Sequence, residues 1–260
     1  MLNPATEFTN FSILLSKDKW FNKISNYQEL DRIKENKYNN QSNSWKYEIA
    51  KLKFKNINLE RHVRPSKIYT SIKSGECEAK LLLTVFCDCI HNDKADLILD
   101  TTKTIGAKFE VQCDYLCNES GDVKFLHSSW HIDKHDSTKQ VSSIHPLFHF
   151  EYGNSELNKS EDFNFGDFII LDTPRIMHPP LDIVLGIDFV IKNFYQYKDH
   201  YVLTENPLYK KYIENAQMRL WKPYFISLAS KFHNFGTEYT IQNKLAENIL
   251  ECHHNKDFRA

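Results

Sequence analysis

The chain has 260 residues, with 33 Lys and Arg against 34 Asp and Glu and a formal net charge of −1. This balance argues against a surface dominated by contacts to nucleic acid or to an anionic membrane, although it is compatible with a local basic patch. Hydrophobic residues make up 41% of the chain, which is enough for a sizeable core. We therefore expect a single folded domain over residues 1–260.

The first 56 residues have the pattern of a helical segment. Apolar residues recur at helical spacing from Phe8 to Leu15, and Ser25 is placed to cap a second helix. Residues 34–44 are polar and rich in Asn, which is typical of a loop, and residues 45–54 are expected to form a third helix.

Residues 63–173 change to short β-branched and aromatic runs separated by polar breaks, which predicts strands. The candidate strands are 66–72, 79–90, 95–100, 106–117, 123–133, 145–152 and 167–172. The stretch Asn118-Glu119-Ser120-Gly121-Asp122 suits a hairpin turn, and consecutive hairpins produce an antiparallel sheet. We expect about six strands.

Residues 179–255 return to helical patterning. The run 181–195 is apolar nearly all round, which predicts a buried helix. Asn206 can cap another helix, which Pro223 should kink or end, and 237–253 should form the last one. Helices, then strands, then helices indicate an α+β domain with the helical segments packed on one face of the sheet.

The histidines are concentrated in one part of the predicted sheet, since five of the twelve lie between His127 and His149. Side chains alternate between the two faces of a strand. On the first strand of this hairpin His127, His131, Asp133 and His135 share a face, and on the second His145, His149 and Glu151 do so.

Pairing of the two strands would place His131 opposite or diagonal to His149. Asp133 would lie near Leu147, with His145 or His149 as its neighbour. We therefore expect His131, Asp133 and His149 to form a cluster, with His127, His145 and Glu151 as second candidates.

Three interpretations of this cluster stay open. His131 and His149 with the Asp133 carboxylate could bind a divalent metal, or one histidine held by Asp133 could act as a general acid or base. The third is a solvated hairpin face without a function. The motif H-E-x-x-H is absent, and His135-Asp136 resembles the HD dipeptide of metal-dependent phosphohydrolases, whose helical fold differs from a hairpin.

A second group of polar residues, Asp172, Arg175 and His178, lies where a strand should end and a helix begin. The Arg175 guanidinium could bind a phosphate or carboxylate in a bidentate manner. Alternatively, Arg175 braces the structure by pairing with Asp172 or Asp182.

The cysteines offer a weaker metal signal. One face of a predicted strand carries Cys87, Cys89 and His91, and one face of a later strand carries Cys113 and Cys117. Four thiolates could therefore hold zinc. Their spacing differs from the usual C-x-x-C pair, and buried free thiols are the alternative.

Two features are compatible with nucleic acid. Asp100 followed by Glu110 and Gln112 resembles the D…E-x-(K/Q) pattern of restriction-endonuclease-like nucleases, in which carboxylates hold magnesium. Residues 17–23 and 209–212 mix basic and aromatic side chains. Ordinary strand residues and solvated helix edges are the alternatives.

Several common functional classes are excluded or disfavoured. The seven glycines lie far apart, so the chain has no Gly-rich phosphate loop and no G-x-S-x-G motif. No apolar run reaches the roughly 18 residues of a membrane span. The N-terminus lacks a basic start followed by an apolar stretch, so we expect a cytoplasmic protein with mostly reduced cysteines and no membrane partner.

These observations favour a hydrolase of phosphoester or related anionic bonds, with or without a divalent metal cofactor. His131 and His149 would be base or ligands, Asp133 orienter or ligand, and Arg175 the anion-binding group. The alternatives are a non-catalytic protein-interaction subunit with structural histidines and, less favoured by the net charge, a nucleic-acid-binding module.

Overall fold

A six-stranded antiparallel sheet in the order β1-β2-β3-β4-β5-β6 forms the centre of the computed structural model. The structure describes residues 3–18, 20–35, 38–59, 79–91, 102–116, 123–134, 146–153 and 175–230. The strands are β1 (Ser44–Lys55), β2 (Lys80–Ile90), β3 (Thr104–Leu116), β4 (Val123–Lys134), β5 (Phe148–Tyr152) and β6 (Ile176–Met177). The predicted α+β class with an antiparallel sheet is therefore confirmed.

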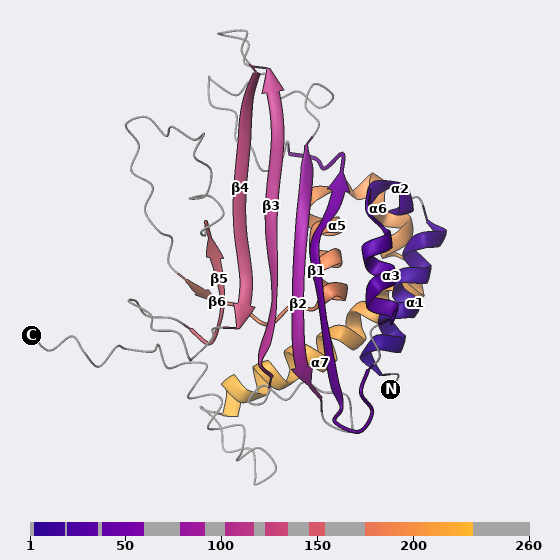
Figure 1. Cartoon of the computed structure of the whole chain (residues 1–260), viewed down its shortest axis with the longest axis vertical. Helices are drawn as coiled ribbons and strands as arrows, with labels where there is room; N and C mark the ends of the chain where they lie inside the picture. Colours follow the sequence, from indigo (N-terminus) through magenta and orange to yellow (C-terminus); the bar gives the residue numbers. More distant parts are fainter. Residues whose placement is uncertain are drawn as a thin grey trace, which may run out of the picture.

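Helices precede and follow the sheet in the chain. They are α1 (Pro4–Lys17), α2 (Trp20–Lys23), α3 (Gln28–Glu35), α5 (Ile183–Phe194), α6 (Tyr197–Thr204) and α7 (Pro207–Ser230). Figure 1 shows α5 and α7 behind the sheet and the N-terminal helices beyond its β1 edge. Among the described helices, none has the length and apolar character needed to cross a membrane.

Side chains alternate between the two faces of the sheet, and α5 packs on one of them, the covered face. We call the opposite face the open face. On the covered face, Phe109 of β3 contacts Phe189 of α5 with ring centroids 4.8 Å apart, and Trp130 of β4 stacks on Phe194 at 5.6 Å. The open face carries the side chains between these positions, among them Lys46, Glu48, Thr84, Phe86, Lys108, Glu110, His131, Asp133, His149 and Glu151. Most of these side chains are polar or charged.

A buried ion cluster joins the helices under the sheet. Arg219 of α7 donates to Glu7 of α1 at 2.9 Å and to Asp182 at 3.1 Å, and all three residues are buried. Asp182 also accepts from the backbone N–H of Leu185 and so caps α5. One guanidinium thereby holds three helices together.

The predicted third helix at 45–54 is wrong, because this segment is β1. Trp45, Tyr47 and Ile49 are buried while Lys46 and Glu48 are exposed, which is the two-residue period of a strand. The N-terminal helical segment is consequently shorter than residues 1–56, and the sheet begins before residue 63.

Other boundaries agree with the structure to within a few residues. The predicted strands at 79–90, 106–117, 123–133 and 145–152 correspond to β2, β3, β4 and β5, and the helix at 181–195 corresponds to α5. Pro223 does not end its helix, since α7 continues to Ser230. The predicted strands 66–72, 95–100 and 167–172, the turn 118–122 and the helix 237–253 lie outside the described residues.

Candidate metal centre

Two neighbouring cross-strand pairs bring two histidines and two carboxylates together on the open face. Asp133 of β4 lies opposite His149 of β5, and His131 lies opposite Glu151. His131 is therefore diagonal to His149, and their ring centroids are 5.4 Å apart with the planes at 83°. Of the two histidines predicted as neighbours of Asp133, the structure places His149 opposite it, while His145 lies outside the described residues.

Both imidazoles face both carboxylates. The His149 Nε2 atom lies 3.4 Å from Asp133 Oδ1 and 3.8 Å from Glu151 Oε2. The His131 Nε2 atom lies 3.8 Å from Asp133 Oδ2 and 3.6 Å from Glu151 Oε2. The four side chains therefore bring their nitrogen and oxygen atoms to one place on the sheet.

The spacing suits a small divalent cation. His131, Asp133 and His149 each offer one ligand atom, and the three atoms lie within 4.8 Å of one another. Nitrogen and oxygen ligands about 2.1 Å from zinc lie about 3.4 Å apart in a tetrahedron and at most about 4.2 Å apart. A relative movement of at most about 1.4 Å between two side chains would therefore bring atoms 4.8 Å apart to the tetrahedral spacing around one ion.

The cluster is largely shielded from water. The His149 side chain is 2% exposed and that of His131 is 12% exposed. Burial, together with the positive charges of Lys108 and Arg175, lowers the pKa of His131 to about 4. Its imidazole is therefore neutral at pH 7 and keeps a lone pair for a metal.

Arg175 is part of the same site. Its Nε donates to Glu151 Oε2 at 2.8 Å, the oxygen that also faces both imidazoles. Of the two partners predicted for Arg175, Asp182 binds Arg219, and Asp172 lies outside the described residues. His178 lies outside the cluster, with its Nδ1 2.6 Å from the Pro179 carbonyl oxygen.

Gly106 makes room for the carboxylate. It lies opposite Asp133 on β3, and a Cβ atom added there would be 2.5 Å from Asp133 Cβ. The same atom would be 2.7 Å from both the Ile132 carbonyl oxygen and the tip of the Phe86 ring. A side chain at this position would therefore displace Asp133.

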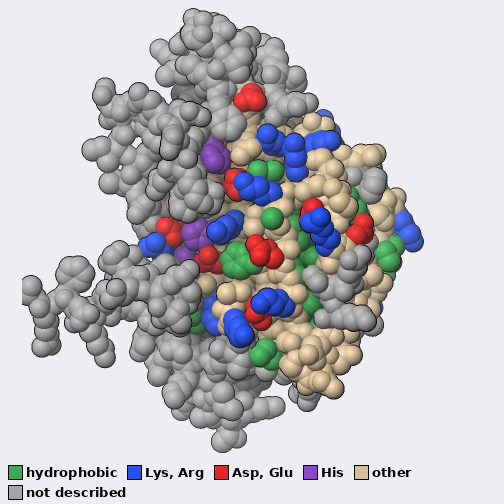
Figure 2. Space-filling model, in the orientation of Figure 1, with side chains coloured by type: hydrophobic (Ala, Val, Ile, Leu, Met, Phe, Trp, Pro, Cys, Tyr) green, Lys and Arg blue, Asp and Glu red, His purple; other side chains and the backbone are tan. Residues whose placement is uncertain are grey.

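Among the remaining candidate histidines, the described one, His127, is not in the cluster. His127 lies farther along β4, with its Nε2 3.7 Å from Glu110 Oε2. His135 and His145 lie outside the described residues. Figure 2 shows histidine side chains next to acidic and basic ones on this face.

The described cysteines do not assemble the four-thiolate site. Cys87 and Cys89 are buried free thiols with their Sγ atoms 3.2 Å apart, and burial raises the pKa of Cys87 well above its usual value. Cys113 is disulfide-bonded, so it has no thiolate to offer and departs from the expectation of reduced thiols. Cys117 lies outside the described residues, as does Asp100 of the nuclease-like pattern.

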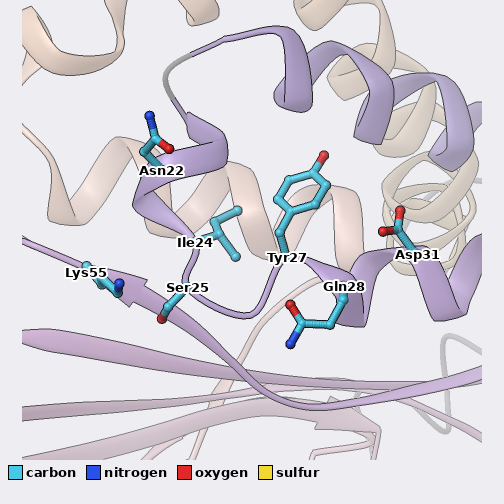
Figure 3. Close-up of a pocket in the computed structure, with 7 residues that line it drawn as sticks. All are labelled: Asn22, Ile24, Ser25, Tyr27, Gln28, Asp31 and Lys55. Atoms are coloured by element: carbon cyan, nitrogen blue, oxygen red, sulfur yellow. The ribbon is translucent and has the colours of Figure 1, made fainter.

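A surface pocket lies away from this cluster, between α2, α3 and the end of β1. Its volume is about 370 Å³, and its lining residues are Asn22, Ile24, Ser25, Tyr27, Gln28, Asp31 and Lys55 (Figure 3). The Tyr27 hydroxyl is engaged with Ser12 at 3.1 Å. The pocket shares no residue with the metal centre.

No protein-family model matches the chain, and the comparisons with curated proteins and with solved structures found no match either.

Proposed function

We propose that the protein is a metal-dependent hydrolase that acts on a phosphoester or related anionic substrate in the cytoplasm. The observation that carries this proposal is the approach of the ligand atoms of His131, Asp133 and His149 to within 4.8 Å of one another. These three side chains would hold one divalent cation, and Arg175 would attract the anionic substrate.

The burial of the cluster favours metal binding over a solvated hairpin face. A solvated hairpin face would leave its histidines exposed, whereas the side chain of His149 is 2% exposed. Metal binding is favoured over a single general acid or base because both imidazoles face the same two carboxylates, those of Asp133 and Glu151.

The number and kind of the candidate metal ligands support hydrolysis as the reaction. Two neutral imidazoles and one carboxylate suit zinc, and three protein ligands leave a coordination position for water. Zinc lowers the pKa of such a water to near 7 and polarises a phosphoryl or carbonyl oxygen. The Arg175 guanidinium, which is bound to Glu151 next to the two imidazoles, would supply positive charge for the substrate.

An assay with 4-nitrophenyl phosphate tests the activity. We expect the zinc- or manganese-loaded protein to release nitrophenol, and the rate to fall at least a hundredfold after chelation or in His131→Ala and His149→Ala. An equal rate in the folded variants would contradict the proposal.

A protein-interaction role is the second candidate, and the exposed apolar side chains of α6 support it. Tyr197, Tyr201 and Val202 are 58%, 47% and 56% exposed, and the two tyrosine rings are 5.9 Å apart. Grouped exposed apolar residues are typical of docking surfaces. Concentration-dependent association that Val202→Lys abolishes in sedimentation velocity would support this role, and a monomer at all concentrations would count against it.

A further inference from the structure

Lys108 is the basic residue of the open face that pairs across the sheet with a candidate metal ligand. It lies on β3 directly opposite His131, next to the metal centre, and it is only partly exposed. Within the ranges that the structure describes, its ammonium group makes no ion pair and no hydrogen bond. Its charge nevertheless reaches the centre, because it contributes to the lowered pKa of His131.

Two other lysines on this face have carboxylate partners. Lys46 lies 3.4 Å from Asp88, and Lys51 lies 4.0 Å from Glu110. A partly buried ammonium without a partner loses hydration and gains nothing in return. An anionic ligand at the centre would supply the missing contact.

The two cations lie on opposite sides of the candidate ligands. Lys108, His131 and Glu151 follow one another across β3, β4 and β5, and Arg175 binds Glu151 from the far side. Adjacent strands are about 4.8 Å apart, so Lys108 and Glu151 are separated by about 10 Å at the backbone. Both long basic side chains can reach a ligand seated over His131.

The charges of the site indicate the charge of that ligand. Histidines that bind a metal are neutral. Among the described residues of the site, Asp133 and Glu151 offset Lys108 and Arg175, so a divalent cation leaves this set with a formal charge of about two. A dianion neutralises this charge, whereas a phosphodiester carries a single negative charge.

We propose that Lys108 and Arg175 bind a dianionic terminal phosphate group from two sides, and that the substrates of the site are phosphate monoesters. This inference rests on the metal centre of the proposed function and narrows its substrate class. Lys108 would contact the substrate and take no part in holding the metal.

Inorganic phosphate is a suitable probe, measured by isothermal titration calorimetry with the zinc-loaded protein. We expect Lys108→Met to weaken phosphate binding at least tenfold, as the loss of a charge-assisted contact does, while Lys108→Arg keeps most of the affinity. Lys80→Met is the matched control, since Lys80 is a partly exposed lysine on the open face opposite Gln112, away from the centre. It should bind phosphate like the wild type.

Zinc content measured on the same samples separates the two proposals. Normal zinc content with unchanged phosphate affinity in Lys108→Met would overturn the role of Lys108 and leave the metal centre standing. A wild-type protein that takes up no zinc would overturn both. Faster hydrolysis of bis(4-nitrophenyl) phosphate than of 4-nitrophenyl phosphate would overturn the monoester assignment alone.

Discussion

Gly106 and Asp133 face each other across the β3–β4 pair, so close that a Cβ atom on Gly106 would lie 2.5 Å from Asp133 Cβ. Gly106→Ala should therefore push Asp133 away from the two imidazoles. We expect weaker zinc binding and a loss of about 1–3 kcal/mol in the free energy of unfolding, as in other overpacked sites. Zinc titration and urea unfolding measure these effects.

Gly186→Ala in α5 is the control for that experiment. Its added Cβ would meet the nearest atoms, on Leu83 and Val85, at 3.6 Å, which is ordinary van der Waals contact. Because alanine favours the helix over glycine by up to about 1 kcal/mol, stability should be kept or raised. Equal losses in the two variants would contradict the special role of Gly106.

Glu151 should tune the metal centre through its contacts with both imidazoles and with Arg175. Glu151→Gln removes the charge while keeping the shape, and we expect zinc affinity to fall about 10–100-fold, the usual cost of losing a group that orients metal ligands. Competition with a chromogenic chelator measures the affinity. The exposed Glu48 on the open face of β1 provides Glu48→Gln as a control, which should bind zinc normally.

Arg219 should be a major source of stability. Arg219→Met would leave the buried carboxylates of Glu7 and Asp182 without their partner, at a cost of about 3–5 kcal/mol in urea unfolding. Arg32→Met removes an ion pair from an arginine side chain that is 73% exposed and should cost less than about 1 kcal/mol. Similar losses in both variants would contradict a large contribution of the buried ion cluster to the free energy of unfolding.

The stability of the protein should fall in mild acid because of His91. Burial and the charge of Arg219 lower the pKa of His91 from its usual 6.5 to about 4. Between pH 4 and pH 6.5 His91 is protonated in the unfolded chain and neutral in the folded chain. The free energy of unfolding therefore falls as the pH drops below 6.5. The loss at pH 5 is about 2 kcal/mol.

His91→Gln tests this pH dependence by urea unfolding at pH 5 and pH 7.5. The lowered pKa of His131 acts in the same direction, so the comparison between variant and wild type isolates His91. The variant should lose less stability between the two pH values. A parallel pH dependence in both proteins would contradict the assignment.

The alternation of side chains predicted much of the site from sequence. It placed His131 and Asp133 on one face of a strand and His149 on the same face of the next strand. The structure brings these three residues together. The alternation left the register open, because His145 and His149 were both possible neighbours of Asp133, and the structure places His149 opposite it. The register depends on the length and shape of the connection between the strands, which periodicity does not specify.

Residues that act through tertiary contacts were harder to predict. Gly106 and Lys108 acquire their roles only from the pairing of β3 with β4, which the sequence does not specify. The strand β1 was predicted as a helix, although Trp45, Tyr47 and Ile49 alternate with charged residues. The helices α1 and α5 were predictable, because apolar spacing alone carries that signal.

The metal content of the purified, zinc-reconstituted protein tests the account most directly. Inductively coupled plasma mass spectrometry should find one zinc per wild-type chain and a large loss in Asp133→Asn and His149→Gln, with circular dichroism confirming that the variants fold. A folded wild-type protein without bound zinc, manganese or iron, or variants with the same metal content as the wild type, would contradict the metal centre.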